Sequence, residues 1–98
     1  MNRLVLAATL IERGAVRYTP AGLPALHMLL KHESELSEDG QPRRVCLEIR
    51  AVAIGAITRP AGAMALGTAA TFAGFLGATR NGRGLVLHIT ALDAVLPA

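Results

Sequence analysis

The chain has 98 residues, of which 52% are hydrophobic and 3% aromatic, and its formal net charge is +3. That length predicts one domain with one core over residues 1–98, and the high apolar content excludes a disordered segment. Alanine, leucine and valine must fill the core, because Tyr18, Phe72 and Phe75 are the only aromatic residues.

Nine of the ten cationic residues are arginine, and Lys31 is the exception. Arginine suits phosphate groups because its planar guanidinium donates two parallel hydrogen bonds. Four of the seven acidic residues gather between Glu33 and Asp39, so the rest of the surface is more basic than the net charge indicates. The arginine bias is compatible with a nucleic-acid partner.

Cys46 is the only cysteine, which excludes an internal disulfide and a cysteine-based metal site. No signal-peptide pattern opens the chain, so we expect a cytoplasmic protein. Residues 60–79 carry no charge and match a membrane span in length, but small residues make up most of them. We therefore expect no membrane partner.

The first part of the chain predicts two strands. Residues 2–12 are rich in Leu, Val, Ile and Thr and lack Gly and Pro, so we expect a first strand buried over much of both faces. Thr19-Pro20-Ala21-Gly22 has the composition of a turn. Residues 25–34 predict the second strand, with one face formed by Leu26, Met28, Leu30 and His32.

A polar stretch, residues 35–44, predicts a loop, and residues 45–55 predict the third strand. Alternation in this strand places Val45, Leu47, Ile49 and Ala51 inward and Cys46, Glu48 and Arg50 outward. Residues 56–68 have no strand pattern and predict a loose loop or one helical turn that ends at Gly67.

Residues 69–78 and 85–95 predict the fourth and fifth strands, and Gly74 and Gly77 in the fourth indicate a bulge or a bend. Five strands predict a small closed barrel, because glycine residues allow the strands to curl. The five-stranded barrel of this length is the oligonucleotide/oligosaccharide-binding (OB) fold, which makes the expected class all-β. A β-sandwich or an SH3-like barrel would suit the periodicity nearly as well.

The turn between the last two strands carries two cations. Asn81-Gly82 predicts a type I′ hairpin turn, because both residues tolerate positive φ. Arg80 and Arg83 flank this turn and would point into solvent. There they either keep the hairpin soluble or contact an anionic partner.

Short motifs along nearly the whole chain resemble those of one known family in order and spacing. They are NRLVL at residues 2–6, Thr9, Pro20-x-Gly22-x-Pro24, KHES at 31–34, Gly40 with Arg43 behind it, Gly55, Gly67, GF at 74–75, Asn81-Gly82 and VLH at 86–88. This family is that of primosomal replication protein N (PriB), in the single-stranded DNA-binding (SSB) branch of the OB fold. The resemblance implies an OB-fold homodimer that binds single-stranded DNA at replication forks in the bacterial cytoplasm. It also implies a PriA-type restart helicase and other primosome proteins as partners.

The resemblance implies that basic residues of this chain contact DNA where their positions match those of the family's basic DNA-contacting residues. With three neighbouring candidates added, the expected DNA-binding residues are Arg17, Tyr18, Lys31, Arg43, Arg44, Arg80 and Arg83. The chain departs from the family's best-known member on the third strand, where Cys46 replaces a base-stacking tryptophan. Its loop between the last two strands is also shorter and holds fewer lysines. Because stacking is worth ~1–3 kcal/mol per base, we expect affinity about tenfold lower or more.

Other interpretations of these residues remain open. Arg43 and Arg44 could balance the neighbouring acids, and Tyr18 could cap the barrel with its hydroxyl in water. The three histidines have no carboxylate at ligand spacing, so we expect no metal and no cofactor. No nucleophile motif is present, and we expect no enzyme activity. The alternative function is a protein–protein adaptor dimer with weak or no DNA binding.

Overall fold

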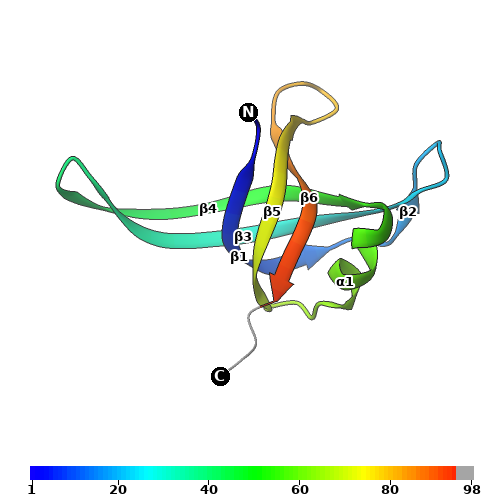
Figure 1. Ribbon diagram of the computed structural model, residues 1–98, viewed down its shortest axis with the longest axis horizontal. Coiled ribbons are helices and arrows are strands. Elements are labelled where there is room, and N and C mark those ends of the chain that lie inside the picture. The colour runs from blue at the N-terminus through cyan, green and yellow to red at the C-terminus, as the bar shows by residue number, and fades with distance from the viewer. Residues whose placement is uncertain (95–98) are drawn as a thin grey trace.

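The computed structural model describes residues 1–94, and strands dominate it. The strands are β1 (Leu4–Arg13), β2 (Arg17–Tyr18), β3 (Pro24–Glu38), β4 (Gln41–Ile54), β5 (Ala69–Ala78) and β6 (Leu85–Ala94). A short 3-10 helix, η1 (Gly55–Ile57), and a helix, α1 (Thr58–Ala63), connect β4 to β5 (Figure 1).

The strands close into a barrel because β1 has partners at both of its edges. The order in the sheet is β1-β5-β6-β4-β3-β2, and β1 also pairs with β3. β1 runs antiparallel to both β5 and β3, whereas β4 and β6 run parallel. β2 only extends the edge of β3 by two residues. The barrel itself therefore has five strands, which confirms the predicted OB fold and decides among the three folds that the periodicity allowed.

The core lies inside the barrel and contains one large ring. The largest fully buried side chains are Phe72, Leu10, Leu26, Leu30 and Leu87. Each points inward from its strand, and Leu26 and Leu30 share one face of β3, as the alternation predicts. α1 packs against the same core through Ala61, and Met64 is buried beside it.

The segment between β4 and β5 is more regular than the sequence predicts. Residues 55–63 form η1 and then α1, where we expected a loose loop or one turn. α1 ends before Met64, which is extended (ψ 135°), so the prediction that Gly67 ends it is wrong. Gly67 lies in a later turn with a φ of 87° and donates its N–H to the Leu10 carbonyl (2.7 Å). That hydrogen bond ties the connecting loop to β1.

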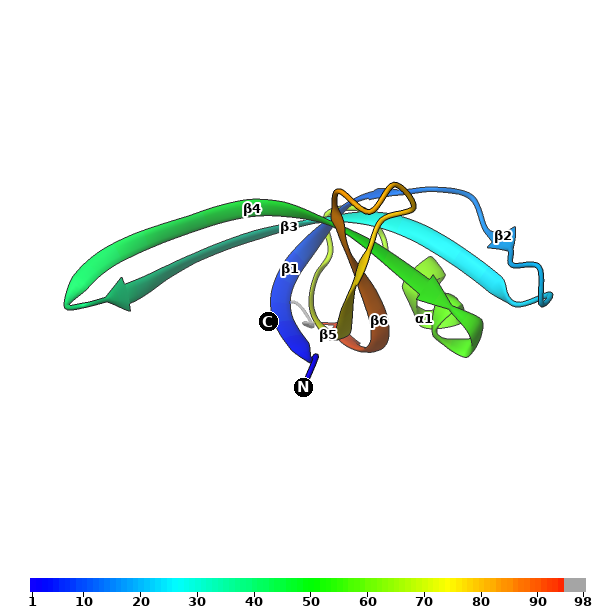
Figure 2. The same ribbon diagram turned by 90° about the horizontal axis from the view of Figure 1, so that it is seen from above.

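β3 and β4 continue beyond the barrel as one long hairpin (Figure 1, Figure 2). The last β3 residue paired with β1 is Lys31, and we call residues 32–47 the arm. The predicted loop over residues 35–44 is wrong, because the β3–β4 ladder runs to its tip. There Asp39 and Gly40 have φ values of 50° and 74°, as in a type I′ turn. The stretch is polar because both faces of the arm lie in water.

The arm also changes two burial predictions. Leu47 is 39% exposed because it lies beyond the barrel, so its predicted inward position is wrong. Ile49 packs against the core and Ala51 is buried, so the alternation holds once β4 enters the barrel. β1 is buried on one face only: Leu10 is fully buried, whereas Val5 is 55% exposed. Burial over both faces of β1 was therefore a wrong prediction for the single chain.

β5 approaches β6 closely at Gly74. The pairing register shifts between Ala73 and Gly74, which is the β-bulge that the sequence indicates. A Cβ at Gly74 would lie 1.7 Å from the His88 carbonyl oxygen, so only glycine fits this approach. The predicted end of the fifth strand at Val95 lies outside the described residues.

The uncharged residues 60–79 form part of α1, a connecting loop and β5. Charges are missing from this segment because both elements contribute buried side chains to the core. In the part of the chain that the structure describes, no helix is both long enough and apolar enough to cross a membrane.

Candidate nucleic-acid interface

One row of side chains crosses the outer face of the barrel. His27 of β3 pairs with Val52 of β4, Val52 pairs with His88 of β6, and His88 pairs with Phe75 of β5. Paired residues in neighbouring strands point to the same face of a sheet. These four side chains therefore lie next to one another on the outer face of the sheet, where their neighbours leave Val52 only 6% exposed, and we call them the central row.

A groove with a volume of ≈ 540 Å³ lies over three members of this row, His27, Val52 and His88. Its lining residues are Thr19, Ala25, His27, Arg50, Val52, Ile54, Ala78, Thr79, Arg80, Val86 and His88. The loop after β2 supplies Thr19, and the loop between β5 and β6 supplies Arg80. The groove therefore lies between two loops that are far apart in the sequence, with apolar side chains of β4 and β6 at its floor.

Internal hydrogen bonds hold the β5–β6 loop, residues 79–84, in shape. Asn81 Oδ1 accepts a hydrogen bond from the Arg83 N–H (2.9 Å) and another from the Thr79 hydroxyl (2.8 Å). The Thr79 hydroxyl in turn accepts from the Gly84 N–H (3.0 Å). The loop consequently presents its two exposed arginines on a backbone that is already ordered.

The predicted type I′ turn in this loop is wrong. Among residues 1–94, Asp39 is the one non-glycine residue with a positive φ, so Asn81 does not adopt the required conformation. The Gly82 N–H donates to the Thr79 carbonyl (2.8 Å), which makes residues 79–82 the reversal. Asn81 instead bonds the N–H two residues ahead through its side chain, as in an Asx turn, and this interaction replaces the two-residue hairpin turn.

The groove is basic. Arg50 and Arg80 line it, and none of its lining residues is acidic. The ion pairs within residues 1–94 involve Lys31, Arg43 and Arg44, so neither groove arginine is neutralised in this way. A concave surface with charges of one sign concentrates ions of the opposite sign.

Arg17 and Tyr18 form β2 at the edge of this groove. Arg17 pairs with Ala25, which lines the groove, and Tyr18 pairs with Pro24. Both side chains are exposed, and Tyr18 is exposed to 72%. A ring that is so exposed does not cap the barrel, and its face is open to a flat ligand.

The predicted cations of the arm are paired with acids of the arm itself. Arg43 Nε lies 3.3 Å from Glu38 Oε1. The Arg44 guanidinium lies 3.7 Å from a carboxylate oxygen of Glu33 and 3.7 Å from one of Glu35. These exposed pairs add little stability, but they cancel positive charge locally. The arrangement is the one expected if Arg43 and Arg44 balance the neighbouring acids.

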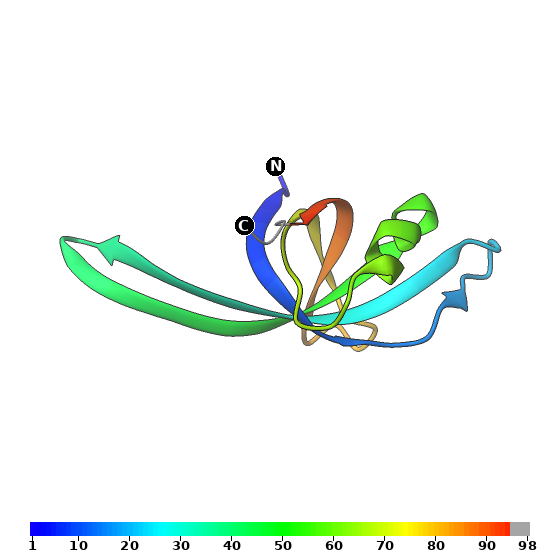
Figure 3. The same cartoon turned by 90° about the horizontal axis from the view of Figure 1, so that it is seen from below.

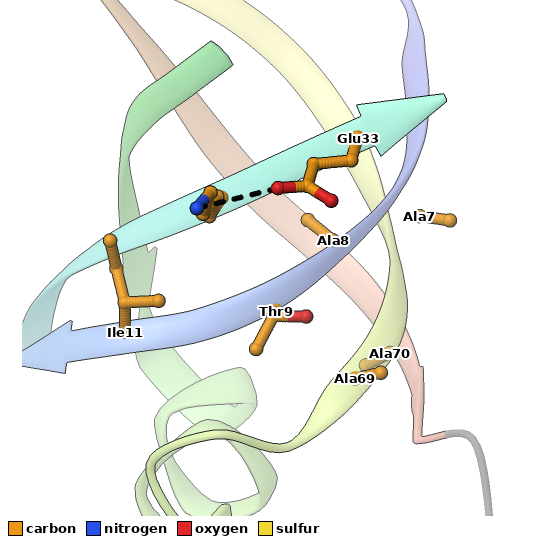
Figure 4. A pocket seen from close by; sticks show the side chains of 8 residues that line it. Ala7, Ala8, Thr9, Ile11, Glu33, Ala69 and Ala70 are labelled. Carbon is orange, nitrogen blue, oxygen red and sulfur yellow. Dashed lines mark ion pairs between the residues drawn. The ribbon is translucent and has the colours of Figure 1, made fainter. Parts of the chain in front are cut away.

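A different pocket lies beside β1, with Ala8 and Glu33 in its lining (Figure 4), and Lys31 also lines it. Small side chains such as Ala7 and Thr9 line this pocket, and Lys31 Nζ lies 3.4 Å from Glu33 Oε1. The pocket shares no lining residue with the groove. The structure therefore does not bring Lys31 together with Arg80.

Cys46 and the histidines occupy separate places. Cys46 points outward from the arm, as predicted, and its Sγ lies 3.9 Å from Glu33 Oε1. His32 Nδ1 lies 2.6 Å from the Ala7 carbonyl oxygen at the base of the arm, whereas the other two histidines line the groove. Within the described residues, no three His, Cys, Asp or Glu side chains form a group that could hold a metal ion.

Sequence reasoning misses His27, Arg50 and His88 as candidate site residues. The alternation already places Arg50 on an outward face and His27 on the face of its strand opposite Leu26 and Met28. To place these residues in one site, the parallel pairing of β4 with β6 must also be known, because it sets Arg50 opposite Val86. No local pattern in the sequence indicates that pairing.

Sequence comparisons agree with this fold. The model of a family described as "Another single-strand binding protein family" matches residues 2–91. The replication restart protein PriB of Bordetella pertussis is 52% identical over 81 residues, which cover 83% of this chain and 76% of that protein. PriB of Nitrosomonas europaea is 32% identical over 89 residues, or 90% of this chain and 82% of that protein.

Solved structures show the same relationship. PriB from Ralstonia solanacearum has a TM-score of 0.89 and 38% identity, with 98% of this chain and 99% of that chain covered. The single-stranded DNA binding protein from Thermus aquaticus has a TM-score of 0.76 and 24% identity, with 98% and 50% covered, which shows a shared fold. By sequence and by structure, the chain belongs to the PriB family, within the single-strand binding branch of the OB fold.

Proposed function

We propose that the protein binds single-stranded DNA in the groove and acts as an accessory protein of replication restart. The observation that carries this proposal is the position of Arg50 and Arg80 in a groove between two loops, without an acidic residue in its lining. OB folds bind oligonucleotides on this face, between the loop after the first strand and the loop between the last two strands. The names of the relatives supply the connection with replication restart.

In this proposal, phosphates lie against Arg50 and Arg80, with Arg17 and Arg83 at the two loops beside them. The bases lie toward the apolar floor that Val52 contributes to. Phosphate contacts carry no sequence information, so the expected binding has little base preference. The ordered β5–β6 loop lowers the entropy cost of binding, because its arginines need no rearrangement of the backbone.

The protein partners are the finer part of the proposal. From the resemblance, we propose a homodimer that stimulates a PriA-type restart helicase and works with other primosome proteins. DNA held on one face of the barrel leaves the arm, which projects from it (Figure 3), available for another contact.

A protein–protein adaptor remains the second candidate, and two observations favour it. The arm cations Arg43 and Arg44 are balanced by acids. Cys46, at the position where the family's best-known member carries a tryptophan, offers no ring for stacking. An adaptor would need little affinity for DNA of its own.

A salt titration of oligo(dT) binding separates the two functions. The affinity of a DNA-binding groove should fall steeply as salt rises, because each neutralised phosphate releases condensed counterions. An adaptor should bind the oligonucleotide weakly or not at all, even at low salt. The measurement is the anisotropy of a labelled oligonucleotide at several salt concentrations, and absence of binding at the lowest of them would contradict the proposal.

A further inference from the structure

The rings of Phe75 and His88 are stacked on the outer face of β5 and β6. Their centroids are 4.7 Å apart and their planes differ by 5°, which describes an offset parallel stack. Phe75 is still 42% exposed, although its ring is one of only three aromatic rings of Phe and Tyr in the chain. The stack therefore presents open apolar surface to solvent.

The backbone holds this stack in place. Phe75 and His88 are direct partners in the β5–β6 ladder. Gly77, two residues further along β5, leaves room for the imidazole, since a Cβ there would lie 2.9 Å from His88 Nε2. The orientation of the rings is thus set before any ligand arrives, which reduces the ordering cost of a flat ligand.

The stack lies at the end of the central row, between three hollows of the surface. His88 lines the groove that contains Arg80. Phe75 and His88 together line a smaller hollow beside Val52. Phe75 also lines a third hollow, to which Arg3 contributes. Because neighbouring hollows share these two rings, a strand that leaves the groove toward Arg3 must pass over the stack.

We propose that the Phe75–His88 stack is a nucleobase-stacking site and that Arg3 contacts the phosphate beyond it. This inference rests on the proposed function and extends the DNA path past the groove. Every base has a π face, so such a site holds a single strand without reading its sequence. Arg3 is exposed and takes part in no ion pair within residues 1–94, which leaves its guanidinium available for a phosphate.

Fluorescence tests the stacking contact directly. The chain contains no tryptophan, so Phe75→Trp introduces a single reporter at the proposed site. Addition of oligo(dT) should quench its emission and saturate at the affinity measured by anisotropy. Leu66→Trp is the matched control, because Leu66 is 60% exposed and lines none of the three hollows. Its emission should stay unchanged.

Two further variants separate the base contact from the phosphate contact. Phe75→Leu should weaken oligo(dT) binding by about tenfold and keep the parent's salt slope, because a stacking surface is lost but no charge. Arg3→Ala should instead flatten the plot of log affinity against log salt by roughly 0.7. Leu66→Ala, the control for loss of an exposed apolar side chain, should bind like the parent.

The outcomes distinguish this inference from the proposed function. If the parent binds with a steep salt slope while Phe75→Trp is not quenched and Phe75→Leu keeps parental affinity, the stacking site is wrong and the DNA-binding groove stands. If the parent does not bind at low salt, both are wrong. Thermal melts establish that each variant is folded, and if Phe75→Leu does not melt cooperatively, the quenching of Phe75→Trp decides alone.

Discussion

Replacing Arg50 and Arg80 together by alanine should weaken single-stranded DNA binding and flatten its salt dependence. Both side chains line the groove, and neither forms an ion pair within residues 1–94. Both are exposed, so their loss should change the free energy of unfolding by less than about 0.5 kcal/mol. The matched control is the double variant Arg43→Ala with Arg44→Ala. It removes the same charge from the arm, where both arginines are paired with acids.

The magnitude follows from the number of phosphate contacts. For single strands, each contact contributes roughly 0.7 to the slope of log affinity against log salt, so loss of two contacts should flatten the slope by about 1.4. Between about 50 and 200 mM salt, the parent should then lose about sevenfold more affinity than the groove variant does. The arm variant should keep a slope close to that of the parent.

The assay is the anisotropy of a labelled oligo(dT) over a salt series, with thermal melts of each variant to confirm folding. Equal slopes for the groove variant and the parent would refute the assignment of phosphates to Arg50 and Arg80. Equal losses in the groove variant and the arm variant would also refute it. That result would mean that the total charge, rather than contacts in the groove, attracts the DNA.

Three other predictions concern the fold. Gly74→Ala should lower the free energy of unfolding by roughly 2–3 kcal/mol, because its Cβ would lie 1.7 Å from the His88 carbonyl oxygen; an unchanged melting temperature would show that the bulge relaxes. Leu30→Asp should abolish the cooperative melt, because an unpaired buried charge costs several kcal/mol, whereas Leu47→Asp, at 39% exposure, should keep it. Unfolding of both variants would contradict the position of the arm. Sedimentation at micromolar concentration should give a dimer, because β1 pairs on only one edge before Thr9; a single 10.2 kDa species would contradict this expectation.

Local periodicity in the sequence determined the barrel strands and the shared face of Leu26, Met28 and Leu30 in β3. Leu26, Met28 and Leu30 recur at every second position, and in a strand that spacing places them on one face whatever surrounds the strand. The same rule placed Arg50 and Cys46 outward before any partner strand was known. Gly74 indicated the bulge, because glycine in the middle of an apolar strand marks a close approach of backbones.

The extent of the arm needed the tertiary structure. Residues 35–44 have the composition of a loop, yet they pair along the β3–β4 ladder up to Asp39-Gly40. A hairpin that is surrounded by water can be polar on both faces. The polar composition of these residues therefore shows that they are exposed to solvent, and it does not show that they lack strand pairing. The predicted burial of Leu47 was wrong for the same reason. Alternation assigns a residue to one face of its strand, but it does not show where the strand leaves the core.

The candidate site was decided almost entirely by long-range pairing. The resemblance to a family supplied Arg80, but it supplied neither Arg50 nor the stack of Phe75 on His88. Those residues meet because β4 runs parallel to β6 and β6 antiparallel to β5, which aligns the central row across the barrel. Such contacts join segments far apart in the chain and leave no local pattern, so only the closed barrel brings them together.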